Sequence, residues 1–209
     1  MQLPFTAEQF FSVFRVYNES VWPVQMALLG LAVTALGCVF LRGRKADISV
    51  SAILAFLWLW LGAVYHLTFF YPINSLAIAF GTLSIAGSMV FVWAGGLNAD
   101  LRFRPVRGFR AYVGLAFIFY SLVLYPAASI YAGHPYPEMP TFGLPCPTAI
   151  FTIGLLSFLE PPYPRLPFVV PVVWSFVGLQ AAFFLGVPQD LALLPAAAWG
   201  IWLAVRNRE

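Results

Sequence analysis

Long runs of apolar residues, separated by short polar or proline-rich stretches, dominate the pattern of this chain. A helix rises about 1.5 Å per residue and the hydrocarbon core of a bilayer is about 30 Å thick, so roughly 20 apolar residues cross it. Most of the runs reach or approach that length, and the fifth and the last are short. The pattern predicts membrane-spanning helices at residues 22–41, 49–70, 74–96, 111–131, 147–159, 168–186 and 190–205.

The stretch TAEQFFSVFRVYNES, just before the first apolar run, predicts an amphipathic helix. Thr6 and Gln9 have the spacing of a capping box. At helical spacing its residues divide into an apolar face and a polar face, with Phe10, Phe14, Tyr17 and Val21 on the first and Glu8, Ser12, Arg15 and Glu19 on the second. We therefore expect residues 1–20 to form an interfacial helix on the outer membrane surface, and residues 21–209 to form one transmembrane domain.

Composition supports a membrane protein. Apolar residues make up 61% of the chain and charged residues only 9%, whereas a soluble domain is typically about 25% charged. So few charges cannot cover a globule, and the outer surface must face lipid. The predicted fold class is therefore all-α, a polytopic membrane bundle of seven transmembrane helices whose surface contacts membrane lipids.

The basic residues predict the orientation of the bundle. If the seven segments alternate, all basic residues except Arg15 fall on one side, after the first, third, fifth and seventh segments. The positive-inside rule then places the N-terminus outside and the C-terminus in the cytoplasm. We interpret the arginine-rich loop LRFRPVRGFR, residues 101–110, as a topology signal beside lipid headgroups and not as a nucleic-acid site.

Small residues follow one stripe of the third predicted helix. Ala77, Gly81, Ser84 and Ser88 recur at helical spacing. Small side chains let two helices approach closely in lipid, so this stripe predicts a packing face.

Residues 134–148, HPYPEMPTFGLPCPT, interrupt the apolar pattern with five prolines. A helix from Pro147 to Glu160 rises only about 20 Å, which leaves roughly 10 Å of hydrocarbon to cross. Proline removes backbone donors, and non-helical backbone at that depth must lie inside protein or beside water. We expect this segment to fold back into the outer mouth of the bundle and to end at a short, broken fifth helix, with Pro147 first and Cys146 near the cap. The alternative is a loop that packs only as a plug.

A helix that begins at mid-depth directs free amides and a partial positive charge outward, which favours an anionic group. Many transporters build their sites on such broken helices. Polar residues near this level and near the outer face are the predicted substrate-binding set, namely Cys146, Thr148, Gln180, Gln25, Tyr131 and Glu19.

Metal binding is a second hypothesis. Histidine and cysteine are ligands for zinc or copper, and His66, His134 and Cys146 all fall toward the outer side. No pair of them has ligand spacing, and a histidine at a membrane boundary is also explained as a hydrogen-bonded interfacial residue. No nucleophile elbow or phosphate-binding loop is present, and every carboxylate lies outside the predicted apolar spans, so the sequence assigns no reaction and no cofactor.

Four stretches, FSVFRVYNESVWPVQ, GAVYHLTFFYPINSLAIAFG, PTFGLPCPTAIFTIGLL and FFLGVPQDL, resemble a bacterial family of multi-pass membrane proteins of unknown function. The resemblance implies a small bacterial inner-membrane protein and carries no reaction, substrate or site residue. Three functions follow from the residues. They are a small-molecule or ion transporter or binding protein with an outward pocket, a metal-binding membrane protein, and an accessory subunit that packs against a partner or another copy.

Overall fold

The structure, a computed structural model, describes residues 4–207 and is all-α over that range. Isolated bridges are the only β pairing among these residues. In chain order the helical elements are α1 Ala7–Val21, α2 Val24–Val39, α3 Arg44–Trp60, η1 Leu61–Phe70, α4 Ala77–Phe91, η2 Val92–Leu97, α5 Phe109–Phe119, η3 Tyr120–Leu124, α6 Tyr125–Tyr131, α7 Pro145–Leu156, α8 Leu166–Gly178, α9 Gln180–Phe184, η4 Pro188–Ala192 and α10 Leu193–Val205. The first three η elements are π-helical, and η4 is a 3₁₀ helix.

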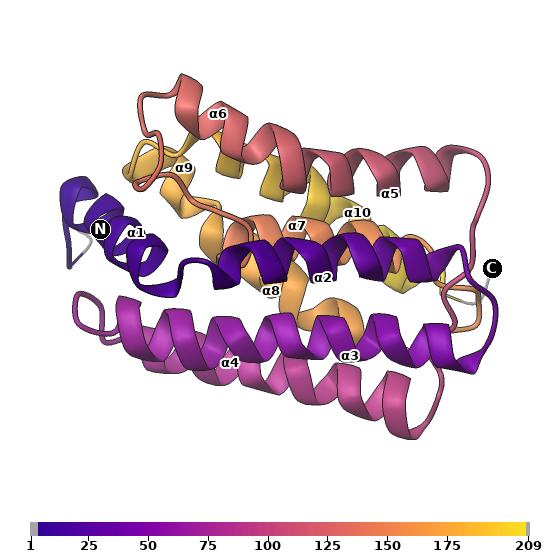
Figure 1. The fold of residues 1–209 in the computed structure, drawn as a ribbon. Coiled ribbons are helices and arrows are strands. Elements are labelled where there is room, and N and C mark those ends of the chain that lie inside the picture. The colour runs from indigo at the N-terminus through magenta and orange to yellow at the C-terminus, as the bar shows by residue number, and fades with distance from the viewer. Residues whose placement is uncertain (1–3, 208–209) are drawn as a thin grey trace.

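The long helices lie roughly side by side, and α1 lies across one end of the bundle (Figure 1). We refer to this as the α1 end; the C-terminal part of the chain ends at the opposite end. Among the described residues, four continuous helices are long and apolar enough to cross a membrane, namely Arg44–Phe70, Ala77–Leu97, Phe109–Tyr131 and Leu166–Phe184. The pair α1 and α2 passes the same test together but is bent by 88°. The fold therefore contains four or five candidate spans, and the predicted seven crossings remain a prediction.

The predicted amphipathic helix is present as α1. Thr6 and Gln9 form the predicted capping box, because each backbone N–H donates to the other side chain, at 2.9 and 3.2 Å. The predicted apolar face is buried and the predicted polar face is exposed. That apolar face packs on the protein itself, in a cluster with Tyr65, Phe70 and Leu144.

α7 lies at the centre of the fold and contacts α5, α8 and α10. Every residue of this helix except Cys146 is buried. Its 12 residues rise about 18 Å, so the fifth helix is short, as predicted. It crosses α5 at a pair of glycines, where a Cβ on Gly154 would lie 2.9 Å from the carbonyl oxygen of Gly114. The predicted packing stripe of α4 is also buried in full.

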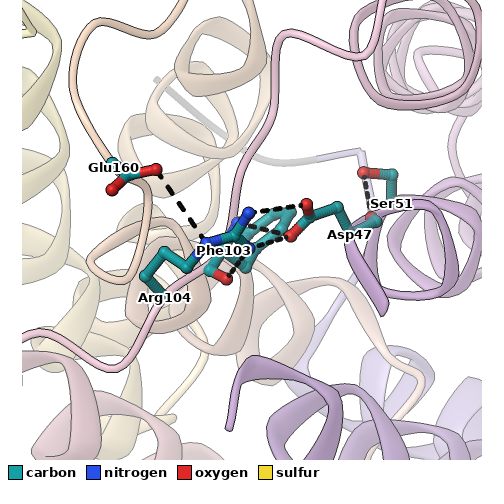
Figure 2. A network of polar contacts seen from close by, with 5 residues as sticks. All are labelled: Asp47, Ser51, Phe103, Arg104 and Glu160. Atoms are coloured by element: carbon teal, nitrogen blue, oxygen red, sulfur yellow. Dashed lines mark hydrogen bonds and ion pairs between the residues drawn. The ribbon is translucent and has the colours of Figure 1, made fainter. Parts of the chain in front are cut away.

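A polar network ties the loops together at the end opposite α1 (Figure 2). Arg104 donates to both oxygens of the Asp47 carboxylate, at 2.7 and 3.1 Å, and the backbone N–H of Phe103 donates to the same group at 2.9 Å. Glu160 lies 3.9 Å from Arg104 on the other side. The hydrogen bond to Asp47 raises the pKa of the Arg104 guanidinium above its ordinary value.

The two loops that meet there also pair through their backbones. The N–H of Arg104 donates to Phe158 and the N–H of Glu160 donates to Arg102, each at 2.8 Å. Nearby, the Tyr163 hydroxyl donates to the Leu203 carbonyl at 3.1 Å, and burial raises the pKa of that tyrosine. Side-chain and backbone hydrogen bonds therefore hold this end of the bundle together.

Candidate functional site

A cavity of about 370 Å³ lies beneath α1. Its walls come from the segment before α1, from α1, η1 and α4, from the start of α7, and from α8, α9 and η4. Pro4, Leu76 and Gln180 are the exposed members of the lining, so the cavity reaches the surface near the starts of α4 and α9. Ligand pockets are typically about 300 to 1,000 Å³, and the volume falls in that range.

Aromatic rings form a large part of the wall. They come from elements far apart in the chain and are Phe5, Phe10, Phe14, Tyr65, Phe70, Phe80, Tyr125 and Trp174. Some of these rings pack edge to face, as Phe80 does with Trp174 at a centroid distance of 5.4 Å, and others stack, as Tyr65 does with Phe70 at 5.8 Å. Such a wall is apolar but has electron-rich ring faces.

His66 is a buried polar residue in this wall. It is 0% exposed, and neither ring nitrogen has a hydrogen-bond partner among the described residues. Its neighbours are rings, with Trp174 at 4.9 Å and Phe80 at 5.8 Å between centroids. It lies on the π-helical element η1, and π-helical segments frequently occur at functional sites. A buried polar group without a partner costs about 1–3 kcal/mol, so a function for His66 has to be sought.

Trp174 and Cys146 approach each other beside Gly178. A Cβ on this glycine would lie 2.9 Å from the Cys146 sulfur and 3.2 Å from Trp174 Nε1, so only a glycine leaves room for both. The indole N–H lies near the sulfur and forms no hydrogen bond within the described residues. Trp174 therefore adds a second unpartnered polar group to the cavity region, and this one is a donor only.

A carboxylate lines the same cavity. Asp190 is 1% exposed and lies next to the Cys146 thiol. The Tyr125 hydroxyl donates a hydrogen bond to its Oδ1. Pro188 begins the 3₁₀ element η4. In this turn the backbone N–H of Asp190 donates to the Val187 carbonyl at 3.0 Å. No lysine or arginine is among the residues that line the cavity.

The segment before α7 is non-helical, as predicted, and buried. Residues 140–144 are buried, and α7 begins at Pro145, two residues before the predicted start. Pro145 and Pro147 carry no N–H, and the N–H of Thr148 is bonded to the Leu144 carbonyl at 3.2 Å. Few free amides remain at this helix start, and Asp190 lies beside it. The geometry therefore disfavours the anionic group that the sequence suggested.

Asn18 and Gln25 hold the same segment in place. Asn18 donates to the carbonyls of Pro137 and Met139 at 2.6 and 2.8 Å, and Thr141 donates to the Asn18 oxygen at 2.8 Å. Gln25 donates to Asn18 and to Thr141. The amide N–H groups of Gln25, a predicted substrate-binding residue, are thus engaged in positioning the chain.

The structure brings three of the predicted residues together and separates the others. Cys146, Gln180 and His66 line the cavity, whereas Thr148, Gln25, Tyr131, Glu19 and His134 do not. Thr148 is buried inside α7, and Glu19 and Tyr131 are exposed, the latter by 96%.

His134 is occupied elsewhere. Its ring stacks on Phe11 at 3.6 Å, and its Nδ1 lies 4.0 Å from Glu138, which also pairs with Arg15. Over residues 4–207 no three His, Cys, Asp or Glu side chains gather in a group that could hold a metal ion.

Asp190, Tyr125 and Trp174 were not among the site residues predicted from the sequence. Asp190 is the first residue of the predicted run 190–205 and was counted as lying outside the apolar spans; its burial was not predicted. The available signal was the motif FFLGVPQDL, in which an aspartate lies two residues after a proline helix start at the edge of an apolar run. Tyr125 and Trp174 gave no signal distinct from the chain's many aromatic residues.

A family model described as "Family of unknown function (DUF6064)" matches residues 7–209, nearly the whole chain. No curated protein and no solved structure matches the chain. The multi-pass membrane character therefore rests on the long apolar helices and not on the family.

Proposed function

This chain belongs to the DUF6064 family, and we propose that it is a multi-pass membrane protein that binds a small, largely apolar molecule in the cavity beneath α1. One observation carries the proposal, namely that His66 is buried in an aromatic wall with both nitrogens unpartnered and faces a cavity of ligand size. A bound molecule that hydrogen-bonds to this imidazole would offset the cost of its burial.

The proposed placement in the membrane has seven crossings, with α2, α7 and η4–α10 joining the four long helices. The basic residues that follow α2, η2, α7 and α10 support it, because the loops that carry them lie at the end opposite α1 (Figure 1). By the positive-inside rule that end is cytoplasmic, and the α1 end with its cavity faces outward from a bacterial inner membrane. α1 then lies along the outer surface, in contact with lipid headgroups.

Binding is favoured over transport by what lies below the cavity. α7 fills the centre with buried side chains, and the network of Asp47 and Arg104 ties the opposite loops together. A transporter would have to move α7 aside and break the Asp47–Arg104 network to release its substrate on the opposite side. A pocket that only receives its ligand from the outer side needs neither change.

Orientation is tested with a membrane-impermeant maleimide on intact cells. In a background without native cysteines, we expect Tyr131→Cys to react, because it is 96% exposed and belongs to the proposed outer side. Leu97→Cys, at the end of η2, is 72% exposed and should react only after the membrane is opened. The reverse pattern would overturn the placement.

Cavity binding is tested with neopentylbenzene, a small uncharged aromatic probe, on the protein in lipid nanodiscs. Ala181 lines the cavity, and Ala181→Trp should fill it and abolish saturable binding above the lipid background. Ala182→Trp, one residue further along α9 and outside the lining, is the matched control and should bind like the wild type. Equal binding by both variants would refute the proposal.

A further inference from the structure

We infer that the ligand of this cavity is an organic monocation with an apolar body, such as a protonated or quaternary amine, held by Asp190 and the surrounding aromatic rings. The inference rests on the proposed binding function and assigns its ligand class. It starts from the lining, in which Asp190 is the one carboxylate and no lysine or arginine is present.

Asp190 has no cationic partner among the described residues. Within residues 4–207, Arg15 pairs with Glu138, and Arg104 pairs with Asp47 and Glu160. His134 lies near Glu138, and no such pair includes Asp190. Its side chain instead accepts a hydrogen bond from the Tyr125 hydroxyl and lies beside the Cys146 thiol. A buried carboxylate is costly without a counter-charge, and in a membrane protein such a residue marks a functional site.

The walls around this carboxylate suit a cation. Trp174, Tyr65 and Phe80 present ring surfaces to the cavity, and tryptophan is the best cation–π partner among side chains. His66, whose nitrogens have no partner, can accept a hydrogen bond from an ammonium N–H through a neutral ring nitrogen. Carboxylate, ring faces and imidazole all favour positive charge, and nothing in the lining except neutral donors would receive an anion.

The apolar part of the ligand follows from the remaining lining. Phe5, Phe10, Phe14 and Phe70 cover the side of the cavity toward α1, and Leu185 and Ala181 cover the side toward α9. These residues offer contact area but no hydrogen bond. A bare metal ion or a small inorganic cation would leave this surface empty, whereas an aromatic or branched amine would fill it.

The test compares two probes of the same shape. Benzyltrimethylammonium carries a permanent positive charge, and neopentylbenzene is its uncharged carbon counterpart. Equilibrium binding of each is measured in nanodiscs for the wild type, for Asp190→Asn and for Asp100→Asn. Asp100 is exposed near the opposite end of the bundle and serves as the matched control for loss of a carboxylate. Comparing one probe across variants removes the effect of its partition into lipid.

We expect Asp190→Asn to weaken benzyltrimethylammonium binding about tenfold or more and to leave neopentylbenzene binding within about twofold. Asp100→Asn should change neither. The uncharged probe also shows that the cavity of Asp190→Asn is intact. If that variant does not fold, the inference is tested on the wild type alone. The wild type must then bind benzyltrimethylammonium and must not bind the anion phenylacetate.

The outcomes separate the two proposals. Binding of neopentylbenzene together with equal cation binding by wild type and Asp190→Asn would overturn the cation inference and leave the binding function standing. Binding of phenylacetate in place of the cation would do the same. Failure of both the cation and the uncharged probe to bind the wild type would overturn both.

Discussion

The side-chain amide of Asn18 donates to the backbone carbonyl of Met139 at 2.8 Å, and this bond joins α1 to the chain segment that leads into α7. The same amide also donates to Pro137, so one buried side chain satisfies two carbonyls of a non-helical stretch. The wall of the cavity beneath α1 depends on both partners, because α1 supplies Phe10 and Phe14 and the segment supplies Pro140 and Leu144.

Asn18→Ala should therefore destabilise the packing of α1 on the segment before α7. Two carbonyls lose their donor, and a buried unsatisfied polar group costs about 1–3 kcal/mol, so we expect a loss of about 2–3 kcal/mol in the free energy of unfolding. SDS titration in mixed micelles measures it. Ser12→Ala, on the exposed face of the same helix, should stay within about 0.5 kcal/mol of the wild type. Equal values for the two variants would show that Asn18 does not hold the segment.

Gly143 is the residue of that segment least tolerant of a side chain. Its φ is 96° and an added Cβ would lie 2.5 Å from Leu28 Cδ1. Gly143→Ala combines backbone strain with a clash, and we expect it to cost about 2–4 kcal/mol. Gly186→Ala is the control for strain alone, since its φ is 72° with nothing within 4 Å of the added atom, and it should cost about 1 kcal/mol.

The clash can be separated from the strain by a double-mutant cycle. Leu28→Ala is destabilising by itself because Leu28 is fully buried. If the two side chains collide, Gly143→Ala with Leu28→Ala should cost about 1 kcal/mol less than the sum of the single variants, measured by the same titration. Strict additivity would contradict the predicted contact.

Local patterns in the chain predicted much of this fold, because they follow from helix geometry. The capping box of Thr6 and Gln9, the two faces of α1 and the buried stripe on α4 all depend on residues within a few turns of one another. The non-helical, buried approach to α7 was also predicted, although the helix begins at Pro145 and includes Pro147, because a proline in the first turn loses no hydrogen bond within the helix.

The cavity required information that no local pattern holds. His66, Cys146 and Asp190 stand on η1, α7 and η4, and only the packing of these elements brings them to one wall. The burial of Asp190 depends on Tyr125, which lies 65 positions earlier in the chain. Gln25 was predicted to bind substrate, but its amide is bonded to Asn18 and Thr141, a pairing made where α1 and α2 meet at a bend of 88°.

At the opposite end, Arg104→Ala should lower the free energy of unfolding, because it leaves the buried Asp47 carboxylate without its cationic partner. Asp47 keeps the bond from the Phe103 backbone, and Arg104 is partly exposed, so we expect a loss of about 2 kcal/mol. Arg107→Ala, an exposed arginine in the same loop, should change stability by less than about 0.5 kcal/mol. Thermal unfolding in detergent compares the two, and adding Asp47→Asn to Arg104→Ala should restore part of the loss.

Tyr125→Phe tests the buried pair that supports the proposed ligand site. Tyr125 is buried and its hydroxyl donates to Asp190, so its loss leaves the carboxylate without this donor and should cost about 1–3 kcal/mol. Tyr131→Phe, on a side chain that is 96% exposed, should cost less than about 0.5 kcal/mol. An amide needs that donor less than a carboxylate does, so Tyr125→Phe should be less harmful by about 1 kcal/mol or more when Asp190 is already Asn. The measurement is the free energy of unfolding of the wild type, the two single variants and the double variant. If Tyr125→Phe costs the same in the wild type and in Asp190→Asn, the hydroxyl does not stabilise the carboxylate.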